Sequence, residues 1–243
     1  MFIISRKRIS LILICFLIGI SVYSYQGIKT GTQERAEETI EEATATPVSG
    51  KVVVLDAGHG TPDEGAQSSK GTTEAETNLK IALKVQNLLE QSGCTVILTR
   101  SDEKAIYDLD KTTLKEKKIS DIRNRVKIGN SASADIFVSI HLNKIPQQQY
   151  WGWQCFYSSK SEESMKLAKI LQSSLNGAIQ KDNKRVAMKL DTVYIMKHVE
   201  IPISIVECGF LSNPEEEQQL LDDEYQDKLA WGIYNGIIEY FTK

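Results

Sequence analysis

The hydrophobic positions between residues 51 and 243 follow two alternating patterns. Short continuous apolar runs, rich in Val and Ile, are typical of strands that are buried on both faces of a sheet. They predict strands at 52–55, 94–98, 135–140, 152–157, 192–196 and 203–206. The stretches between these runs repeat apolar residues every three or four positions. They predict helices at 75–92, 119–132, 161–180, 214–221 and 224–241.

This alternation of strands and helices predicts the fold class. We expect an α/β fold, a single domain with a mostly parallel twisted sheet of about six strands flanked by helices. The polar segment 101–118, which is mixed in charge, interrupts the order and is expected to be a surface excursion. In such sheets catalytic groups collect at the carboxyl ends of the strands.

The first 49 residues differ from the rest of the chain. A basic cluster at 6–8 precedes an apolar run at 9–25, which predicts a signal peptide or membrane anchor over 1–25. An uncleaved anchor is favoured over a cleaved signal, and a buried core helix is the third alternative. Residues 26–49 are rich in Glu without apolar periodicity, so we expect a flexible tether rather than a short helix. The catalytic domain would then occupy 50–243, outside the cytoplasm.

The composition of the chain narrows the functional classes that it can belong to. The chain of 243 residues is 41% hydrophobic with a formal net charge of −3, so nothing argues for a nucleic-acid partner. A domain of this size can bury a core without a structural metal. Any metal is therefore expected to be catalytic. No C-x-x-C pair occurs, so the cysteines are expected to be buried free thiols; they are Cys15, Cys94, Cys155 and Cys208.

Three polar sequences directly follow predicted strands, at 56–60, 139–143 and 206–210. Two of the three histidines of the chain, His59 and His141, lie in them, and Glu207 lies in the third. If the strands are parallel, these side chains converge at one edge of the sheet. The alternative for each histidine is a hydrogen-bonded loop residue. The third histidine, His198, is expected to be an ordinary loop or near-site residue.

Two neutral imidazoles and a carboxylate suit a catalytic zinc, which keeps one position for water. A second, free carboxylate can then move a proton between the water and the leaving group. Glu207 is one of the two carboxylates required. The other is expected within 61–76, and the residues alone do not choose among its four acidic side chains. These are Asp63, Glu64, Glu74 and Glu76.

The motifs around these residues resemble those of the zinc-dependent N-acetylmuramoyl-L-alanine amidases, amidase type 3. They lie, in the family's order, at 54–60, 74–79, 98–100, 134–143 and 206–213. The resemblance implies one catalytic zinc held by His59, Glu74 and His141, with Glu207 as catalytic base and acid. It selects Glu74 over Glu76, which stays as the alternative ligand.

The resemblance also implies a function. Such enzymes hydrolyse the amide between the lactyl group of N-acetylmuramic acid and the L-Ala of the peptidoglycan stem peptide. The excursion at 101–118 is similar to that of the germination-specific branch, which acts in the spore cortex, in muramic-δ-lactam formation and in germination. The expected partners are peptidoglycan, the membrane through the anchor, and an activating protein of unknown identity. The expected location is extracytoplasmic, membrane-anchored or secreted, including the forespore or spore envelope.

Departures from the family pattern fall beside the expected ligands, at Ala57, Thr61 and Ala75. They leave the metal affinity open, because neighbouring residues tune it. Asp56 is a candidate for such a neighbour by proximity, whereas the family segment 122–130, which contains Arg125, is expected to serve packing.

Two other functions compete with the amidase. A zinc peptidase of the cell wall would use the same chemistry on a different bond. A non-catalytic wall-binding protein could share the fold, although the intact set of expected site residues argues against it. A dinucleotide-binding enzyme is excluded because no G-x-G-x-x-G follows the first strand.

Overall fold

The computed structural model describes residues 47–243. The predicted anchor at 1–25 and all but the last three residues of the predicted tether lie outside the described residues. Within them, no helix is long and apolar enough to cross a bilayer. Residues 47–50 form a turn in which Val48 is 1% exposed, so the packed core begins slightly before residue 50.

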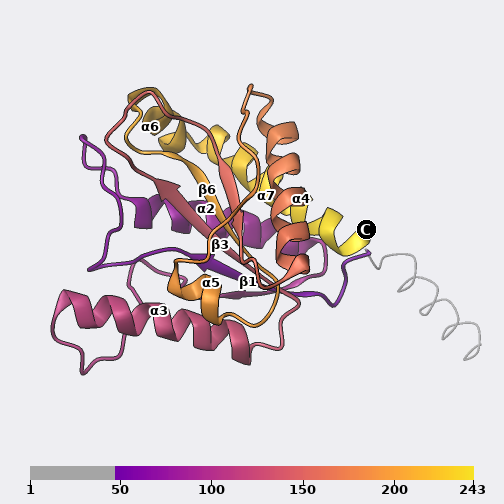
Figure 1. Cartoon of the computed structure of the whole chain (residues 1–243), viewed down its shortest axis with the longest axis horizontal. Helices are drawn as coiled ribbons and strands as arrows, with labels where there is room; N and C mark the ends of the chain where they lie inside the picture. The colour runs from indigo at the N-terminus through magenta and orange to yellow at the C-terminus, as the bar shows by residue number, and fades with distance from the viewer. Residues whose placement is uncertain (1–46) are drawn as a thin grey trace, which may run out of the picture. The chain divides into compact units, whose positions relative to one another are not determined.

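A six-stranded sheet forms the centre of the described domain, with strand order β2-β1-β3-β6-β4-β5 (Figure 1). β1 is parallel to β2 and β3, β3 is parallel to β6, and β4 is parallel to β5. Only the β4–β6 pair is antiparallel within this sheet. The predicted fold class is thereby confirmed. The strands are β1 (Val52–Ala57), β2 (Thr95–Leu98), β3 (Ile136–Asn143), β4 (Gln154–Tyr157), β5 (Met188–Lys189) and β6 (Ile203–Phe210).

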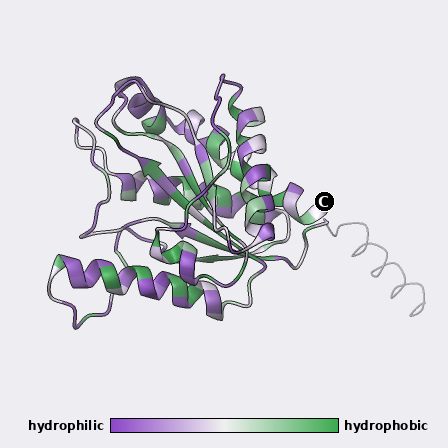
Figure 2. Ribbon diagram, viewed as in Figure 1, coloured by the Kyte–Doolittle hydropathy of each residue, from purple (hydrophilic) through white to green (hydrophobic). Residues whose placement is uncertain are grey.

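Helices cover both faces of the sheet. One core cluster joins the sheet to α2 (Glu74–Gln91), α4 (Glu162–Ile179) and α7 (Asp223–Thr242). A second, smaller cluster joins the opposite face to α3 (Leu114–Ser131) and α5 (Tyr194–His198), which lie together below the sheet in Figure 1. α6 (Pro214–Leu221) follows β6 and packs against α7. Figure 2 shows the apolar residues concentrated on the central strands between these layers.

The two-residue period of the strands decides which side chains reach the site. Val53 and Leu55 of β1 belong to the larger core, whereas Val54 belongs to the smaller core on the α3 face. Asp56 continues the second series, so it points towards α3. On β6, Ile205 belongs to the smaller core, and Glu207 follows it on the same face. The sheet therefore directs its last polar residues to the side covered by α3 and α5.

The structure corrects the predicted elements in three places. Segment 192–196, predicted as a strand, is largely the short helix α5, in which Ile195 and Met196 are buried. A short apolar run does not distinguish these alternatives. The exposed two-residue strand β5 was missed. Helix α3 begins at Leu114 rather than at 119, because Thr113 and Glu116 form a capping box that starts it earlier. The excursion is correspondingly shorter.

Candidate active site

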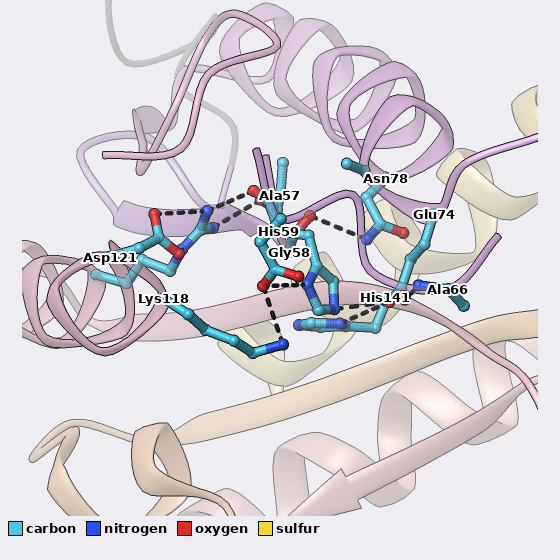
Figure 3. Close-up of polar contacts among 12 residues, drawn as sticks. Ala57, Gly58, His59, Ala66, Glu74, Asn78, Lys118, Asp121 and His141 are labelled. Atoms are coloured by element: carbon cyan, nitrogen blue, oxygen red, sulfur yellow. Dashed lines mark hydrogen bonds and ion pairs between the residues drawn. The ribbon is translucent and has the colours of Figure 1, made fainter. Parts of the chain in front are cut away.

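Three side chains from separate elements meet at the carboxyl edge of the sheet (Figure 3). His59 follows β1, Glu74 is the first residue of α2, and His141 lies near the end of β3. One potential ligand atom from each lies within 4.8 Å of the other two. This is the one such group of three or more His, Cys, Asp or Glu residues found in the described part of the chain.

Glu74 stands between the two histidines. Its Oε1 lies 2.9 Å from His141 Nδ1 and accepts a hydrogen bond from the Leu142 N–H. Its Oε2 lies 3.4 Å from His59 Nε2 and accepts from the Ala66 N–H. Burial alone would raise the pKa of this carboxyl, but the hydrogen bonds with His141 and His59 outweigh burial and lower it. Glu74 is therefore an ionised carboxylate held in place from four directions.

His59 is oriented by a second carboxylate. Its Nδ1 lies 3.1 Å from Asp63 Oδ2, and Lys118 Nζ of α3 lies 3.0 Å from the same oxygen. Burial lowers the pKa of His59, but the hydrogen bonds to Asp63 and Glu74 prevail and raise it to about 9. A carboxylate behind a histidine fixes the ring and its tautomer in many metal sites. Asp63 occupies that position here.

The remaining acidic residues of the 61–76 stretch lie elsewhere. Glu76 pairs with Lys80 at 2.7 Å, and its side chain is 53% exposed. Glu64 accepts a hydrogen bond from the Thr61 hydroxyl at the surface. Of the four competing carboxylates, the structure thus brings Glu74 into contact with both histidines.

Glu207 lies beside the cluster. In the parallel pairing of β3 and β6 it is the register partner of His141. Its Oε2 is one of three buried side-chain polar atoms without a hydrogen-bond partner in the described residues. Burial, together with the charge of Glu74, raises the pKa of Glu207 to about 7. A carboxyl with this pKa can both accept and release a proton near neutral pH.

These groups open into a cleft of about 280 Å³ between α3 and the segment from Leu190 to Ile195. Sequence reasoning missed two features of it. The first is an apolar wall, formed by Ile122, Leu190, Val193, Ile195 and Ile205. The second is Lys118, which lies one helical turn before Asp121 on the face of α3 towards the site. Its seven-residue spacing to Arg125 was the available signal. The third histidine, His198, is stacked on Tyr194 outside this cleft.

The cluster suits a bound metal ion in its donor chemistry. Two imidazoles and one ionised carboxylate are a donor set that zinc accepts in catalytic sites. In the structure these donors contact one another, and the neighbouring Glu207 has a free oxygen. The fold and the site together define an α/β domain with a candidate metal centre at the carboxyl ends of its strands.

Comparison with known proteins identifies the family. Residues 53–239 match the family described as N-acetylmuramoyl-L-alanine amidase. The chain belongs to this family, as its motifs predicted, and the predicted hydrolase class is confirmed.

One relative of known sequence and two solved structures are similar to this chain over most of the described residues. The germination-specific N-acetylmuramoyl-L-alanine amidase of Bacillus subtilis is 40% identical over 197 residues, which is 81% of this chain and 82% of that protein. The CwlD amidase of Clostridioides difficile, solved in complex with the GerS lipoprotein, superposes with a TM-score of 0.77 at 41% identity, over 79% of this chain and 98% of the other. An N-acetylmuramoyl-L-alanine amidase of Clostridium difficile 630 gives a TM-score of 0.70 at 29% identity, over 80% and 98%.

Proposed function

We propose that this chain is a zinc-dependent amidase that uses His59, Glu74 and His141 to hold one zinc ion and Glu207 as catalytic base and acid. The bond cleaved is the amide between the lactyl group of N-acetylmuramic acid and the L-Ala of the stem peptide. The observation that carries the proposal is the convergence of three donor atoms within 4.8 Å beside the unpartnered Glu207 Oε2.

A zinc ion bound by these residues would polarise the scissile carbonyl and make a water molecule more acidic. Glu207 then takes the proton of the attacking water at its free Oε2. It passes this proton to the L-Ala nitrogen as the amide bond breaks. The raised pKa of Glu207, about 7, suits both transfers.

The surrounding residues orient these groups. Asp63 holds the His59 ring at Nδ1, and the Leu142 and Ala66 N–H groups hold both oxygens of Glu74. The apolar wall of the cleft, including Val193 and Ile205, removes water from one side of the site. Exclusion of water strengthens every electrostatic interaction that acts on the reacting amide.

The biological setting follows from the relatives. A germination-specific amidase is 40% identical to this chain, which supports a role in germination. We propose that this role includes spore cortex maturation and muramic-δ-lactam formation. The CwlD amidase was solved with a lipoprotein, GerS, which supports a protein partner for this chain as well. The substrate, peptidoglycan, requires an extracytoplasmic location. We propose that residues 1–25 direct the chain there and that 26–49 connect this segment to the domain.

The test is digestion of purified peptidoglycan by the purified chain, with and without added zinc, followed by mass spectrometry of the products. The proposal expects zinc-dependent release of peptides that begin with L-Ala and leave peptide-free muramic acid. Cleavage inside the stem peptide would replace the amidase by a zinc peptidase. Zinc-independent release of the same products would overturn the metal assignment. Absence of cleavage by a zinc-loaded chain, with and without a candidate lipoprotein partner, would favour a wall-binding protein.

A further inference from the structure

The backbone that carries His59 is held by two buried arginines. Arg125 of α3 donates from Nη1 to the Ala57 carbonyl at 2.7 Å and from Nη2 to the His59 carbonyl. Arg100 donates from Nε to the Ala57 carbonyl at 2.8 Å and from Nη2 to the Gly58 carbonyl at 3.1 Å. The last carbonyl of β1 and the two carbonyls after it therefore each accept a hydrogen bond from a guanidinium group.

Arg100 also reaches the segment that carries Glu74. Its Nη2 donates to the Ala75 carbonyl at 2.7 Å, and Ala75 directly follows Glu74 in the first turn of α2. Its Nη1 donates to the Asp102 carbonyl. Within the described chain, every recorded acceptor of Arg100 is a backbone carbonyl. Arg100 is 3% exposed, and its guanidinium group contacts backbone carbonyls rather than carboxylates. It therefore joins the chain segments that carry His59 and Glu74.

Arg125 is itself fixed by two carboxylates. Its Nη1 lies 2.6 Å from Asp56 Oδ1, and its Nε donates to Asp121 Oδ2 at 2.8 Å. Asp56 in turn accepts hydrogen bonds from the hydroxyls of Thr99 and Ser139. These carboxylates thus fix the orientation of the planar guanidinium group that donates to the His59 loop. Lysine has one ammonium group and cannot reproduce this set of directed bonds.

The held loop has an unfavourable conformation. His59 has a φ of 63°, a left-handed conformation that few residues other than glycine adopt. Such a conformation persists only where the surrounding structure determines it. The carbonyl of His59 itself accepts from Arg125, so the contact acts on the residue that is strained.

We propose that Arg100 and Arg125 are positioning residues that set the metal affinity of the site by holding the His59 loop in its left-handed conformation. Arg100 also fixes the distance between this loop and Glu74. The inference rests on the proposed ligand roles of His59 and Glu74. It changes the expected role of the segment around Arg125 from packing to the organisation of the metal site.

The test measures metal binding in two conservative variants, Arg125→Lys and Arg100→Lys, of the full chain. Zinc affinity is measured by competition with a chromophoric chelator, and the visible absorption of bound Co²⁺ reports the ligand geometry. We expect the dissociation constant for zinc to rise about 10- to 100-fold in each variant, with an altered Co²⁺ spectrum. Leu171→Ala, in the core between α4 and α7, is the control: its melting temperature should fall while metal affinity and spectrum stay unchanged.

The outcomes separate this inference from the proposed function. Folded lysine variants with wild-type zinc affinity and a wild-type Co²⁺ spectrum would overturn the positioning role while leaving the metal site intact. A wild-type chain that binds neither metal would overturn the metal site itself, and the inference with it. If one lysine variant does not fold, the other carries the test, because each arginine donates to the Ala57 carbonyl. Unchanged zinc affinity in that variant would contradict the inference.

Discussion

His141 and Glu207 are register partners on the neighbouring parallel strands β3 and β6. In a parallel pair, partner side chains lie on the same face of the sheet. His141 therefore reaches Glu74, and Glu207 lies beside them with its Oε2 free of hydrogen bonds. The two proposed roles, metal binding by His141 and proton transfer by Glu207, thus fall on side chains of two neighbouring strands.

The first prediction concerns this division of roles. Glu207→Gln keeps the shape of the side chain but removes its ability to take up a proton. We expect kcat to fall by about 10²- to 10⁴-fold, with zinc affinity changed little because Glu207 is outside the three-residue cluster. Product release from peptidoglycan and zinc competition are measured on the same preparation.

The matched control is Glu200→Gln, an exposed carboxylate in the loop between α5 and β6. Its turnover should equal that of the wild type. A Glu207→Gln variant that keeps wild-type turnover would remove Glu207 from the mechanism. Loss of zinc in this variant would instead indicate that Glu207 is a ligand.

The second prediction uses the close passage of the His59 loop over His141. A Cβ added at Gly58 would lie 2.3 Å from His141 Cε1, so either the ring or the loop must move. We expect Gly58→Ala to weaken zinc binding at least about tenfold, because either movement separates the proposed ligands His59 and His141. Calorimetric titration with zinc measures the change.

Gly177→Ala is the control for the added methyl group. Gly177 lies in α4, where nothing is within 4 Å of the added Cβ. This substitution should stabilise the protein by about 0.5–1 kcal/mol, with unchanged zinc affinity. Equal zinc affinity in both alanine variants would show that the loop tolerates a shift, against the prediction.

Much of the fold was predictable because the central strands are long apolar runs buried on both faces. β1, β3 and β6 and the five longest helices of residues 47–243 were all expected near their observed positions. The short elements were not, since α5 spans only Tyr194–His198 and β5 only Met188–Lys189. At these lengths an apolar run fits a strand or one helical turn equally well. In the folded protein, the packing of Ile195 in the smaller core favours the helix.

The site was predictable in part. His59 and His141 stood out because histidines are few and these two fall at strand ends. Residue pattern alone could not select Glu74, because its selection depends on backbone N–H groups from Ala66 and Leu142 that meet only after folding. The contact of Arg125 with His59 was missed for the same reason, since it joins residues 66 positions apart.

The third prediction concerns the buried charges beneath the site. Asp56 is 1% exposed and pairs with Arg125 at 2.6 Å. Asp56→Asn removes one partner of a buried pair and leaves Arg125 with Asp121 alone. We expect a loss of about 3–5 kcal/mol in the free energy of unfolding, measured by urea denaturation of the metal-free chain. The exposed Asp110→Asn should change it by no more than about 0.5 kcal/mol. Similar midpoints for the two variants would contradict the prediction.

The fourth prediction concerns the pH dependence of the metal-free protein. Hydrogen bonds to Asp63 and Glu74 overcome burial and raise the pKa of His59 from 6.5 to about 9. A raised pKa means that the folded state binds the proton more tightly than the unfolded state. The resulting stabilisation is fully present below pH 6.5 and is lost as the pH rises through about 9.

We therefore expect the melting temperature of the EDTA-treated chain to fall between pH 6.5 and 9, the window of the His59 shift. His59→Gln should flatten this fall, whereas His198→Gln should not, because His198 lies outside the cleft and contacts Tyr194. Zinc ligands must be deprotonated to bind the ion, so zinc affinity should instead increase over the same range. Circular dichroism melts with EDTA or excess zinc measure both trends. An equally steep fall in His59→Gln would assign the pH dependence to other groups.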